Sequence, residues 1–410
     1  MTTRAQEPPI DISLPRLLGL GMGTRLLVDT AMQIFAPFLT IFAAGLGVDV
    51  VTMGRLISVR TASGVLAPLL GSLADRHGYR KIMRLSLLLA IGGLLCIGSG
   101  QTLGMVVVGM ILLGFGISSF VPVLHAYLST RLPYAVRARG LGMLEYSWAL
   151  AGIVGLYSAG QLIEALGWRG PLFILASALA VMWGLLGLLP AARVPAAAAI
   201  ETTGPRQAGL RLRLRNFFDL GQHARSAYAA IVADMLIFYA GMQLMLVHGA
   251  WLNAEYQLGA AALGTVALLL GCFDLVASVS VSLFTDRIGK RRSVLLGTVG
   301  MVLGYVLMPW LNVTLPLAIL SIALTRSSFE FGIVSFISLM SEQAPNRRGK
   351  VLSLSSAFAL AGGTLASLTG PWLYVTYGVP GLSLSSMVAG LLSIIILVSL
   401  VQEQSDSDHQ

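Results

Sequence analysis

Twelve apolar stretches, each long enough to cross a bilayer, restrict most strongly what this chain can fold into. A membrane-spanning helix needs about 20 predominantly apolar residues. The stretches lie at residues 16–43, 52–73, 80–99, 103–129, 138–166, 171–190, 225–251, 260–284, 292–311, 315–341, 350–376 and 382–402. Only 11% of the 410 residues are charged, whereas a soluble domain has roughly 25%. The sequence therefore predicts an all-α membrane protein with twelve transmembrane helices.

The longest polar segment, residues 191–224, separates the first six stretches from the second six. It contains small and helix-breaking residues, followed by Arg211, Arg213 and Arg215. We expect an N-terminal six-helix half (1–190), a linker (191–224), a C-terminal six-helix half (225–402) and a short acidic tail (403–410). Two interpretations of the linker stay open, a solvated connector and a short helix at the lipid headgroups.

The positions of the basic residues predict the orientation. With the N-terminus inside, the inner segments hold 22 of the 27 Lys and Arg residues, and the outer loops hold only Arg169. Short cytoplasmic loops retain basic residues. We therefore expect both termini and the linker in the cytoplasm, with Arg169 and Glu255 outside. This distribution also accounts for the net charge of +9 without a nucleic-acid partner.

The sequence contains no feature that indicates an enzyme. Cys96 and Cys272 lie inside apolar stretches, so a disulfide framework and a cysteine metal site are both excluded. An HExxH pair, a nucleophile elbow and a phosphate-binding loop are also absent from the sequence. We expect no catalytic residues, no metal and no cofactor.

Two inner loops carry the same motif about half a chain apart. Residues 71–81 read GSLADRHGYRK and residues 282–292 read SLFTDRIGKRR, at a separation of 211 residues. A second repeat relates WALAG at 148–152 to FALAG at 358–362. Two repeats in equivalent places indicate a tandem duplication, and hence two pseudo-symmetric six-helix bundles.

On this motif, the chain resembles the major facilitator superfamily of secondary transporters over its whole length. The resemblance implies two halves that rock about a central site, giving alternating access. It also implies that the motif holds the inner face closed, through a tight glycine turn and ion pairs. The residues assigned to this gate are Gly71, Asp75, Arg76, Gly78, Arg80, Asp286, Arg287 and Gly289. A role of Asp75 and Arg76 in topology alone stays open beside the gating role.

The fifth helix is similar to that of proton-coupled drug and metabolite exporters in this superfamily. Their pattern G-x8-G-x3-G-P-x2-G-G is matched here by small residues, with Leu156 in place of the proline. The resemblance implies close packing without a proline kink. The packing residues are Gly142, Gly155 and Gly160. In the fourth helix, Met110 and Leu113 replace the exporters' Arg and Gln, so a proton relay there is not implied.

We single out nine ionisable side chains, other than histidine, inside the predicted spans. They are Arg25, Asp29, Arg55, Arg60, Glu145, Asp234, Asp274, Arg326 and Glu330. Each costs about 2.5 to 3.5 kcal/mol at the bilayer centre on an insertion scale, so we expect them to avoid lipid.

Two pairs among these residues have members four positions apart. Arg25 and Asp29 lie on one face of the first helix with Gln33, and Arg326 and Glu330 repeat the spacing on the tenth. Each pair is either a closed salt bridge that orients helices or a site whose members exchange partners during transport.

Asp234 and Asp274 differ because neither has a base within four residues on its own helix. A carboxyl group without a partner in a low dielectric tends to hold a proton. Both are therefore candidate proton carriers, or partners of Arg60 across a central cavity. Asp29 lies about 20 Å into the first helix, near the bilayer midplane, and is our first candidate for proton coupling. Asp234 is its main rival.

Other polar and aromatic residues are candidates for packing or for ligand contact. We expect His125 and Glu145 to make a local pair at the inner ends of the fourth and fifth helices. Several aromatic side chains form either an amphipathic ligand wall or ordinary packing. They are Phe35, Phe38, Tyr146, Trp148, Tyr157, Phe238 and Tyr239.

Together, the residues and the resemblance favour a proton-driven exporter of a small amphipathic organic compound in a bacterial-type plasma (inner) membrane. The expected partners are this substrate, protons and membrane lipid, with the protein acting as a monomer. A metabolite importer or facilitator is an alternative, and so is a lipid-handling transporter of the same fold. A dependence of flux on a pH gradient distinguishes the exporter from a facilitator.

Overall fold

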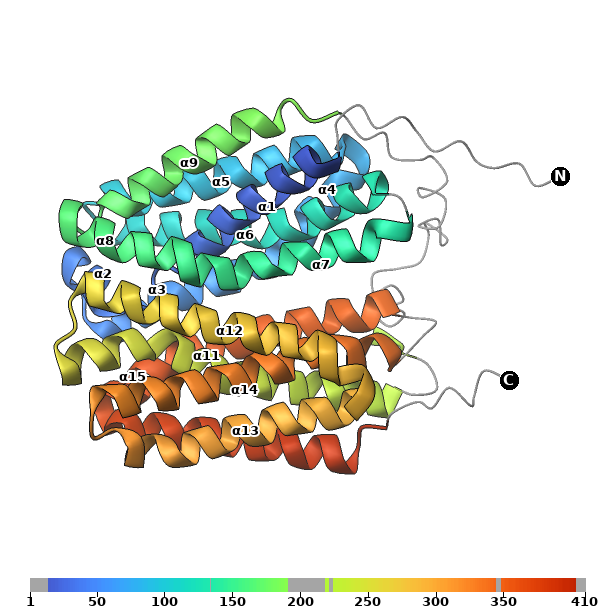
Figure 1. The fold of residues 1–410 in the computed structure, drawn as a ribbon. Coiled ribbons are helices and arrows are strands. Elements are labelled where there is room, and N and C mark those ends of the chain that lie inside the picture. The colour runs from blue at the N-terminus through green and yellow to red at the C-terminus, as the bar shows by residue number, and fades with distance from the viewer. Residues whose placement is uncertain (1–13, 133, 191–217, 221–223, 344–347, 403–410) are drawn as a thin grey trace, which may run out of the picture.

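Two bundles of helices lie side by side in the computed structural model, which describes residues 14–132, 134–190, 218–220, 224–343 and 348–402 (Figure 1). The first bundle contains α1 (Leu14–Gln33), α2 (Leu39–Leu46), α3 (Val50–Ser63), η1 (Gly64–Leu66), α4 (Ala67–His77), α5 (Tyr79–Ser99), α6 (Leu103–Arg131), α7 (Tyr134–Leu150), η2 (Ala151–Leu156), α8 (Tyr157–Leu166) and α9 (Gly170–Leu186). The second contains α11 (Ala224–Tyr256), α12 (Ala260–Ile288), α13 (Lys290–Leu311), α14 (Leu315–Glu342) and α15 (Arg348–Ser399).

These elements form the twelve expected spans. Within the described residues, nine helical segments are long and apolar enough to cross a membrane, and a shorter apolar helix covers Gly170–Leu186. The last segment contains two spans because α15 reverses at Gly378, whose φ of 65° lies in the left-handed region. The broken α1–α2 pair supplies the remaining span. The predicted all-α fold with two six-helix bundles is confirmed. The predicted linker and tail fall almost entirely outside the described residues.

The first span is broken after α1, and Pro37 explains why. Proline has no N–H, so the carbonyl of Gln33 lacks its usual partner four residues on. Gln33 instead accepts a hydrogen bond from the N–H of Ala36 at 3.1 Å. The carbonyl of Met32, which would have accepted from Ala36, is therefore left for another donor.

The fifth span is also irregular, although Leu156 replaces the proline of the exporter pattern. A π-helical turn, η2, runs from Ala151 to Leu156 between α7 and α8. Such turns add one residue to a helical turn and are frequent at functional sites. The span is thus deformed without a proline.

The two repeated loops have the same backbone conformation. Gly78 separates α4 from α5 with φ 93° and ψ 137°, and Gly289 separates α12 from α13 with φ 96° and ψ 143°. Residues with a Cβ rarely adopt this positive φ. The glycine of each motif is therefore needed for the turn itself.

The helices end on two opposite faces. We define the terminal face as the side where α1 begins, α9 ends, α11 begins and α15 ends (Figure 1). The opposite face carries the connections near Asp49, Arg169 and Glu255. At Asp49, the N–H of Thr52 donates to the carboxylate at 2.6 Å and caps α3. This hydrogen bond holds the pKa of Asp49 below its ordinary value.

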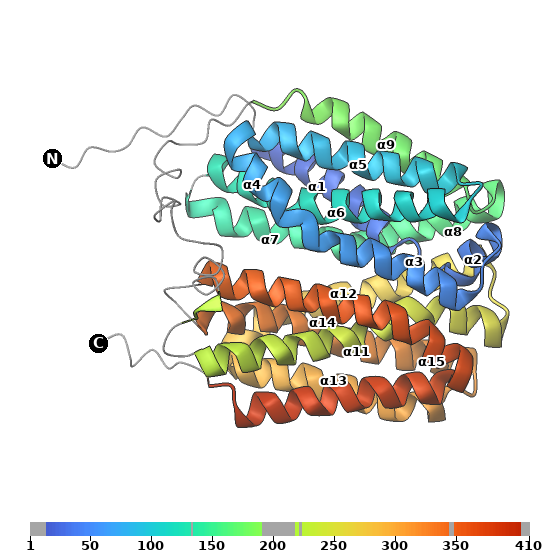
Figure 2. The ribbon, with the colours of Figure 1, turned by 180° about the vertical axis from the view of Figure 1, so that it is seen from behind.

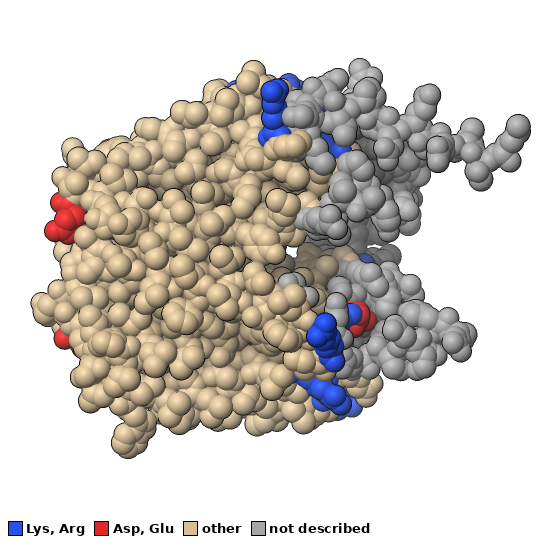
Figure 3. Space-filling view, in the orientation of Figure 1, with Lys and Arg blue, Asp and Glu red and all other residues tan. Residues whose placement is uncertain are grey.

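The two bundles meet closely toward the opposite face. A Cβ on Gly160 would lie 2.6 Å from the carbonyl oxygen of Ala260, and one on Gly54 would lie 2.6 Å from Pro371. From behind, α3 runs along α15 of the second bundle (Figure 2). On the terminal face the surface is hollowed between the bundles (Figure 3). The structure is therefore closed at the opposite face and open at the terminal face.

Candidate functional site

The first bundle contains a cluster of four ionisable side chains centred on Arg25 of α1. Its two terminal nitrogens donate to the two carboxylate oxygens of Glu145 on α7, at 2.8 and 2.7 Å. Its Nη1 also lies 2.8 Å from His125 Nε2 on α6, and its Nε lies 3.5 Å from Asp29. Because a guanidinium only donates, His125 Nε2 accepts here. The expected contact of His125 with Glu145 is present at 3.5 Å.

The face of α1 that carries Arg25 and Asp29 packs against α7. Ser147 donates to Asp29 at 2.5 Å, and Gln33 donates to the carbonyl of Trp148 at 3.1 Å. The four-residue spacing that we read from the sequence thus puts all three polar side chains against one neighbour. Asp29 is buried, whereas the side chain of Glu145 is 59% exposed. Glu145 therefore carries the accessible charge of this cluster.

The second bundle has a cluster of its own, and it differs from the expected arrangement. Arg326 of α14 binds Asp274 of α12 at 2.5 Å, and among the described residues no ion pair joins it to Glu330. Glu330 instead accepts from Ser278 of α12 at 2.9 Å. The two residues on each helix are four positions apart, so α12 and α14 make two successive contacts, which we call rungs: Asp274 with Arg326, and Ser278 with Glu330. The spacing predicted the shared face, but the partner lies on the neighbouring helix.

Asp234 of α11 is buried and accepts a hydrogen bond from Ser355 of α15. No basic side chain pairs with it among the residues that the structure describes. The interpretation of Asp234 and Asp274 as partners of Arg60 does not describe this structure. Asp274 is bound to Arg326, and Arg60 donates to the carbonyl of Met32 at 2.5 Å.

The repeated loop motif serves two structural purposes here. Arg80 donates to the carbonyls of Leu189 at 2.5 Å and Gly187 at 3.4 Å, just beyond the end of α9. Arg291, at the matching position of the second motif, donates to Leu397 and Val398 in the last turn of α15. Each arginine thus satisfies free carbonyls at the C-terminus of the last helix of its bundle.

The gating residues themselves lie around the open terminal face. Arg76 and Arg287 are exposed, and the side chains of Asp75 and Asp286 fall outside the described residues. A Cβ on Gly71 would meet no atom within 4 Å. No neighbouring helix therefore packs closely against Gly71 in this state.

The packing predicted for the fifth span is present at two of three glycines. A Cβ on Gly155 would lie 2.1 Å from Thr30 Oγ1 of α1, and one on Gly160 would lie 2.8 Å from the Cα of Gly264 on α12. A Cβ on Gly142 would meet nothing within 4 Å. The expectation for Gly142 is wrong in this state, because the residue lies toward the open face.

A separate cavity of about 790 Å³ lies between α11 and the two arms of α15. Its walls are apolar apart from Tyr239, Tyr377 and Ser385, and the hydroxyls of Tyr239 and Ser385 are 3.0 Å apart. None of the ionisable residues predicted inside the spans lines it. The charged clusters and this cavity are therefore distinct features.

Sequence reasoning missed the serines that hold the buried acids. Ser147, Ser278 and Ser355 each donate to a carboxylate on another helix. It also missed His248, which is buried in α11 and lies within electrostatic range of Arg326. Serine is common in membrane helices, and its usual acceptor is a carbonyl of its own helix. Only the packing of the helices indicates which serines reach a carboxylate.

Two six-helix bundles around buried charges, open at one face and closed at the other, are the architecture of a membrane transporter. A family model of the Major Facilitator Superfamily matches residues 22–337 and 230–410. The chain belongs to the Major Facilitator Superfamily.

Three similar proteins are consistent with this assignment. YwfA of Bacillus subtilis (strain 168), described as an uncharacterised MFS-type transporter, is 27% identical over 395 residues, covering 94% of this chain and 92% of YwfA. The multidrug resistance protein MdtG of Escherichia coli O6:K15:H31 is 24% identical over 362 residues, covering 86% of each chain. The crystal structure of a D-xylose–proton symporter superposes with a TM-score of 0.76 at 16% identity, over 95% of this chain and 99% of that one. The symporter shares the fold.

Proposed function

We propose that this transporter exports a small amphipathic organic compound in exchange for protons. The observation that carries the proposal is the pair of buried acids, Asp29 and Asp234, each held by one serine at an equivalent place in the two bundles. A carboxyl group that exchanges a proton as its surroundings change can couple proton movement to the opening of either face. The similarity to MdtG, a multidrug resistance protein, supports efflux rather than uptake.

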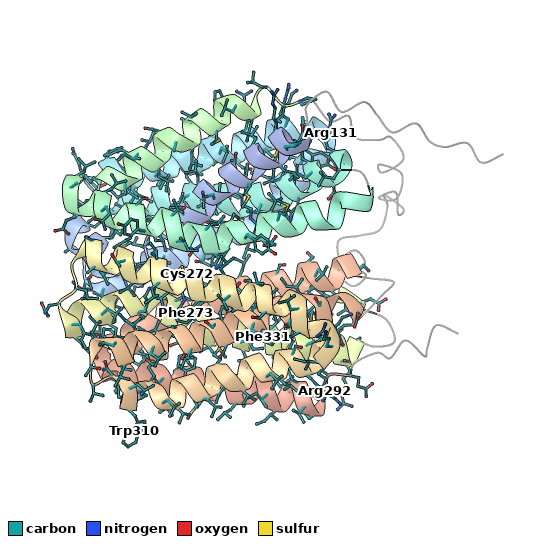
Figure 4. All side chains as sticks on the ribbon, in the orientation of Figure 1. Arg131, Cys272, Phe273, Arg292, Trp310 and Phe331 are labelled. Atoms are coloured by element: carbon teal, nitrogen blue, oxygen red, sulfur yellow. The ribbon has the colours of Figure 1, made fainter. Side chains whose placement is uncertain are left out.

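We further propose that the terminal face is cytoplasmic, so that the structure is the inward-open state. The visible Lys and Arg side chains gather at this face (Figure 3), and Arg131 and Arg292 both lie there (Figure 4). Cytoplasmic loops are enriched in these residues. In this orientation the linker and both termini are inside the cell, in a bacterial plasma membrane, and the protein acts as a monomer.

The loop motifs are proposed to close the terminal face in the alternate state. Arg76 and Arg287 are exposed on the open face, where they are available to a partner from the other bundle. Formation of such ion pairs would stabilise the outward-open state at the expense of the inward-open one. Replacement of Asp75 by Asn is therefore expected to favour the inward-open state while ligand binding persists.

Flux measurements in proteoliposomes test the proposed function. A panel of labelled amphipathic compounds is loaded into vesicles containing the purified protein, and their loss is followed with and without an imposed pH gradient. Efflux that is accelerated by the proton gradient, and abolished by a protonophore, is expected. Equal flux in both conditions would identify a facilitator instead, and uptake driven by inward proton flow would identify a symporter.

A further inference from the structure

Arg60 of α3 is a buried cation without an acidic partner. The residue is 9% exposed. Its Nη1 donates to the carbonyl of Met32, freed by the helix break before Pro37, and its guanidinium carbon lies 5.6 Å from the centroid of the Phe35 ring. No acidic side chain pairs with it among the described residues. One hydrogen bond therefore occupies one of its five donor positions.

The other two buried arginines are neutralised. Arg25 binds Glu145 and Asp29, and Arg326 binds Asp274. The remaining buried acid in the second bundle, Asp234, can become neutral by taking up a proton, but an arginine stays charged in proteins. Arg60 is therefore the buried arginine that lacks a counter-charge among the described residues, and an anion from outside the protein could supply one.

The unused donors of Arg60 are not fully enclosed by protein. The Nε atoms of Arg25 and Arg326 are enclosed by protein and make no hydrogen bond. No nitrogen of Arg60 is both enclosed and unpartnered, although only Nη1 makes a hydrogen bond. Its Nε and Nη2 therefore keep some accessible surface and make no hydrogen bond to the described residues.

Arg60 also lies where the two bundles meet. On the same helix, the methyl group of Thr61 lies 3.6 Å from the Cβ position of Gly363. In η1, which follows directly, the Cβ position of Gly64 lies 3.6 Å from Leu360. Both of these partners belong to α15 of the second bundle. A movement of one bundle against the other would consequently change the access to Arg60.

We propose that Arg60 binds the anionic group of the transported compound, a carboxylate or another oxyanion that accepts hydrogen bonds from Nε and Nη2. The substrate class is then an amphipathic organic anion. This inference rests on the proposed function, since it names the class of compound that the transporter carries. A guanidinium offers two parallel donors to an oxyanion, which makes such contacts strong and directional.

Thermal shift of the purified full-length protein tests the inference with matched probes. 2-Naphthoate, naphthalene-2-sulfonate, 2-naphthyl phosphate and decanoate are compared with 2-naphthylmethylammonium and decylammonium. We expect at least one anion to raise the Tm of the wild type. Any rise caused by a cation should be the same in the wild type and in Arg60→Gln. In Arg60→Gln the affinity for that anion should fall about thirtyfold or more, because a charged partner is lost. Arg60→Lys should retain part of it, since the charge remains without the fork.

Arg55→Gln is the matched control, because it removes the same charge from an exposed position of the same helix. It should bind the anion as the wild type does. The inference is overturned if no anion stabilises the wild type, or if Arg60→Gln and the wild type bind it equally. Should Arg60→Gln fail to fold, Arg60→Lys is compared instead. Weaker anion binding than in the wild type supports the inference, and equal binding overturns it.

A second comparison separates a ligand from an internal partner. If Arg60 instead pairs with Asp234 in the alternate state, Asp234→Asn should weaken transport as Arg60→Gln does, and the double variant should recover. That result would overturn the inference. Anion binding without proton-dependent flux would leave the inference standing and remove the proposed proton coupling. Proton-driven export of cations alone, unaffected by Arg60→Gln, would overturn the inference and leave the proposed proton coupling standing.

Discussion

Ser355 donates a hydrogen bond to the carboxylate of Asp234 in the second bundle. Ser147 makes the same contact with Asp29 in the first, so each bundle holds one buried acid between its first and fifth spans. The two sites differ in one respect. Asp29 lies 3.5 Å from Arg25, whereas Ala230 stands four residues before Asp234. Both bundles thus pair a buried acid with a serine, and only the first adds an arginine.

We predict that Asp29→Asn abolishes proton-driven efflux and leaves substrate binding measurable and insensitive to pH. Asparagine keeps the hydrogen-bonding shape but cannot exchange a proton. Flux with a pH gradient, together with binding measured at several pH values, checks this. Asp49→Asn is the control, because Asn is also a good N-cap and the site is at the opposite face. Wild-type, pH-dependent flux in Asp29→Asn would move the proton site to Asp234 or Asp274, or remove proton coupling.

The two rungs between α12 and α14 should differ in their effect on stability. Asp274→Asn leaves the charge of Arg326 buried without its counter-charge, which costs about 3 to 5 kcal/mol. Glu330→Gln keeps an oxygen that accepts from Ser278, so its cost should be much smaller. Thermal unfolding in detergent compares the two variants. Equal losses of Tm would show that Arg326 does not depend on Asp274.

The loop-motif arginines should divide into stabilising and gating residues. Arg80→Gln and Arg291→Gln each remove charged hydrogen bonds to the end of a helix, and we expect a loss of about 1.5 to 3 kcal/mol for each. Arg76→Gln should change the population of open states with little change in Tm. Thermal unfolding and terminal-face accessibility to a thiol reagent measure the two effects. A large loss of Tm in Arg76→Gln would contradict this division.

Closure of the opposite face should depend on Gly160. A larger side chain there meets the backbone of α12, since even a Cβ would lie 2.6 Å from a carbonyl oxygen. We expect Gly160→Leu to favour the outward-open state and to increase the labelling of cysteines placed between the two bundles near the opposite face. Gly184→Leu on α9 is the control, because a Cβ there meets nothing within 4 Å. Unchanged labelling in Gly160→Leu would mean that α8 and α12 separate without opening a path.

Topology has a direct test at residue 255. In a variant with Cys96 and Cys272 replaced by serine, a cysteine at position 255 should react with a membrane-impermeant maleimide added to intact cells. A cysteine at position 205, in the predicted linker, should react only after the cells are opened. Glu255 accepts from Asn312 at 2.6 Å, so Tm is measured in parallel to confirm folding. Labelling of position 255 from the inside only would reverse the orientation.

The spans were predictable because hydropathy and charge are local properties of the sequence. The predicted 260–284 corresponds to α12 at Ala260–Ile288, and the predicted end at 376 lies near the reversal at Gly378. The spacing of Arg326 and Glu330 correctly gave their common face. It could not give Asp274 as the partner, because the rotation of α12 against α14 depends on packing between helices. The same holds for Ser147 and Ser355, which reach carboxylates on other helices.

The break before Pro37 has a mechanical consequence. α1 is tied to its own bundle through Arg25 and Glu145. Pro37 abuts the second bundle, where a Cβ on Gly249 would lie 2.0 Å from its carbonyl oxygen. Since the ladder of hydrogen bonds is already interrupted there, bending at this point breaks no further helical bond. The first span can thus bend at this point as a hinge between two rigid helices. Rocking of the bundles then requires little deformation of an intact helix.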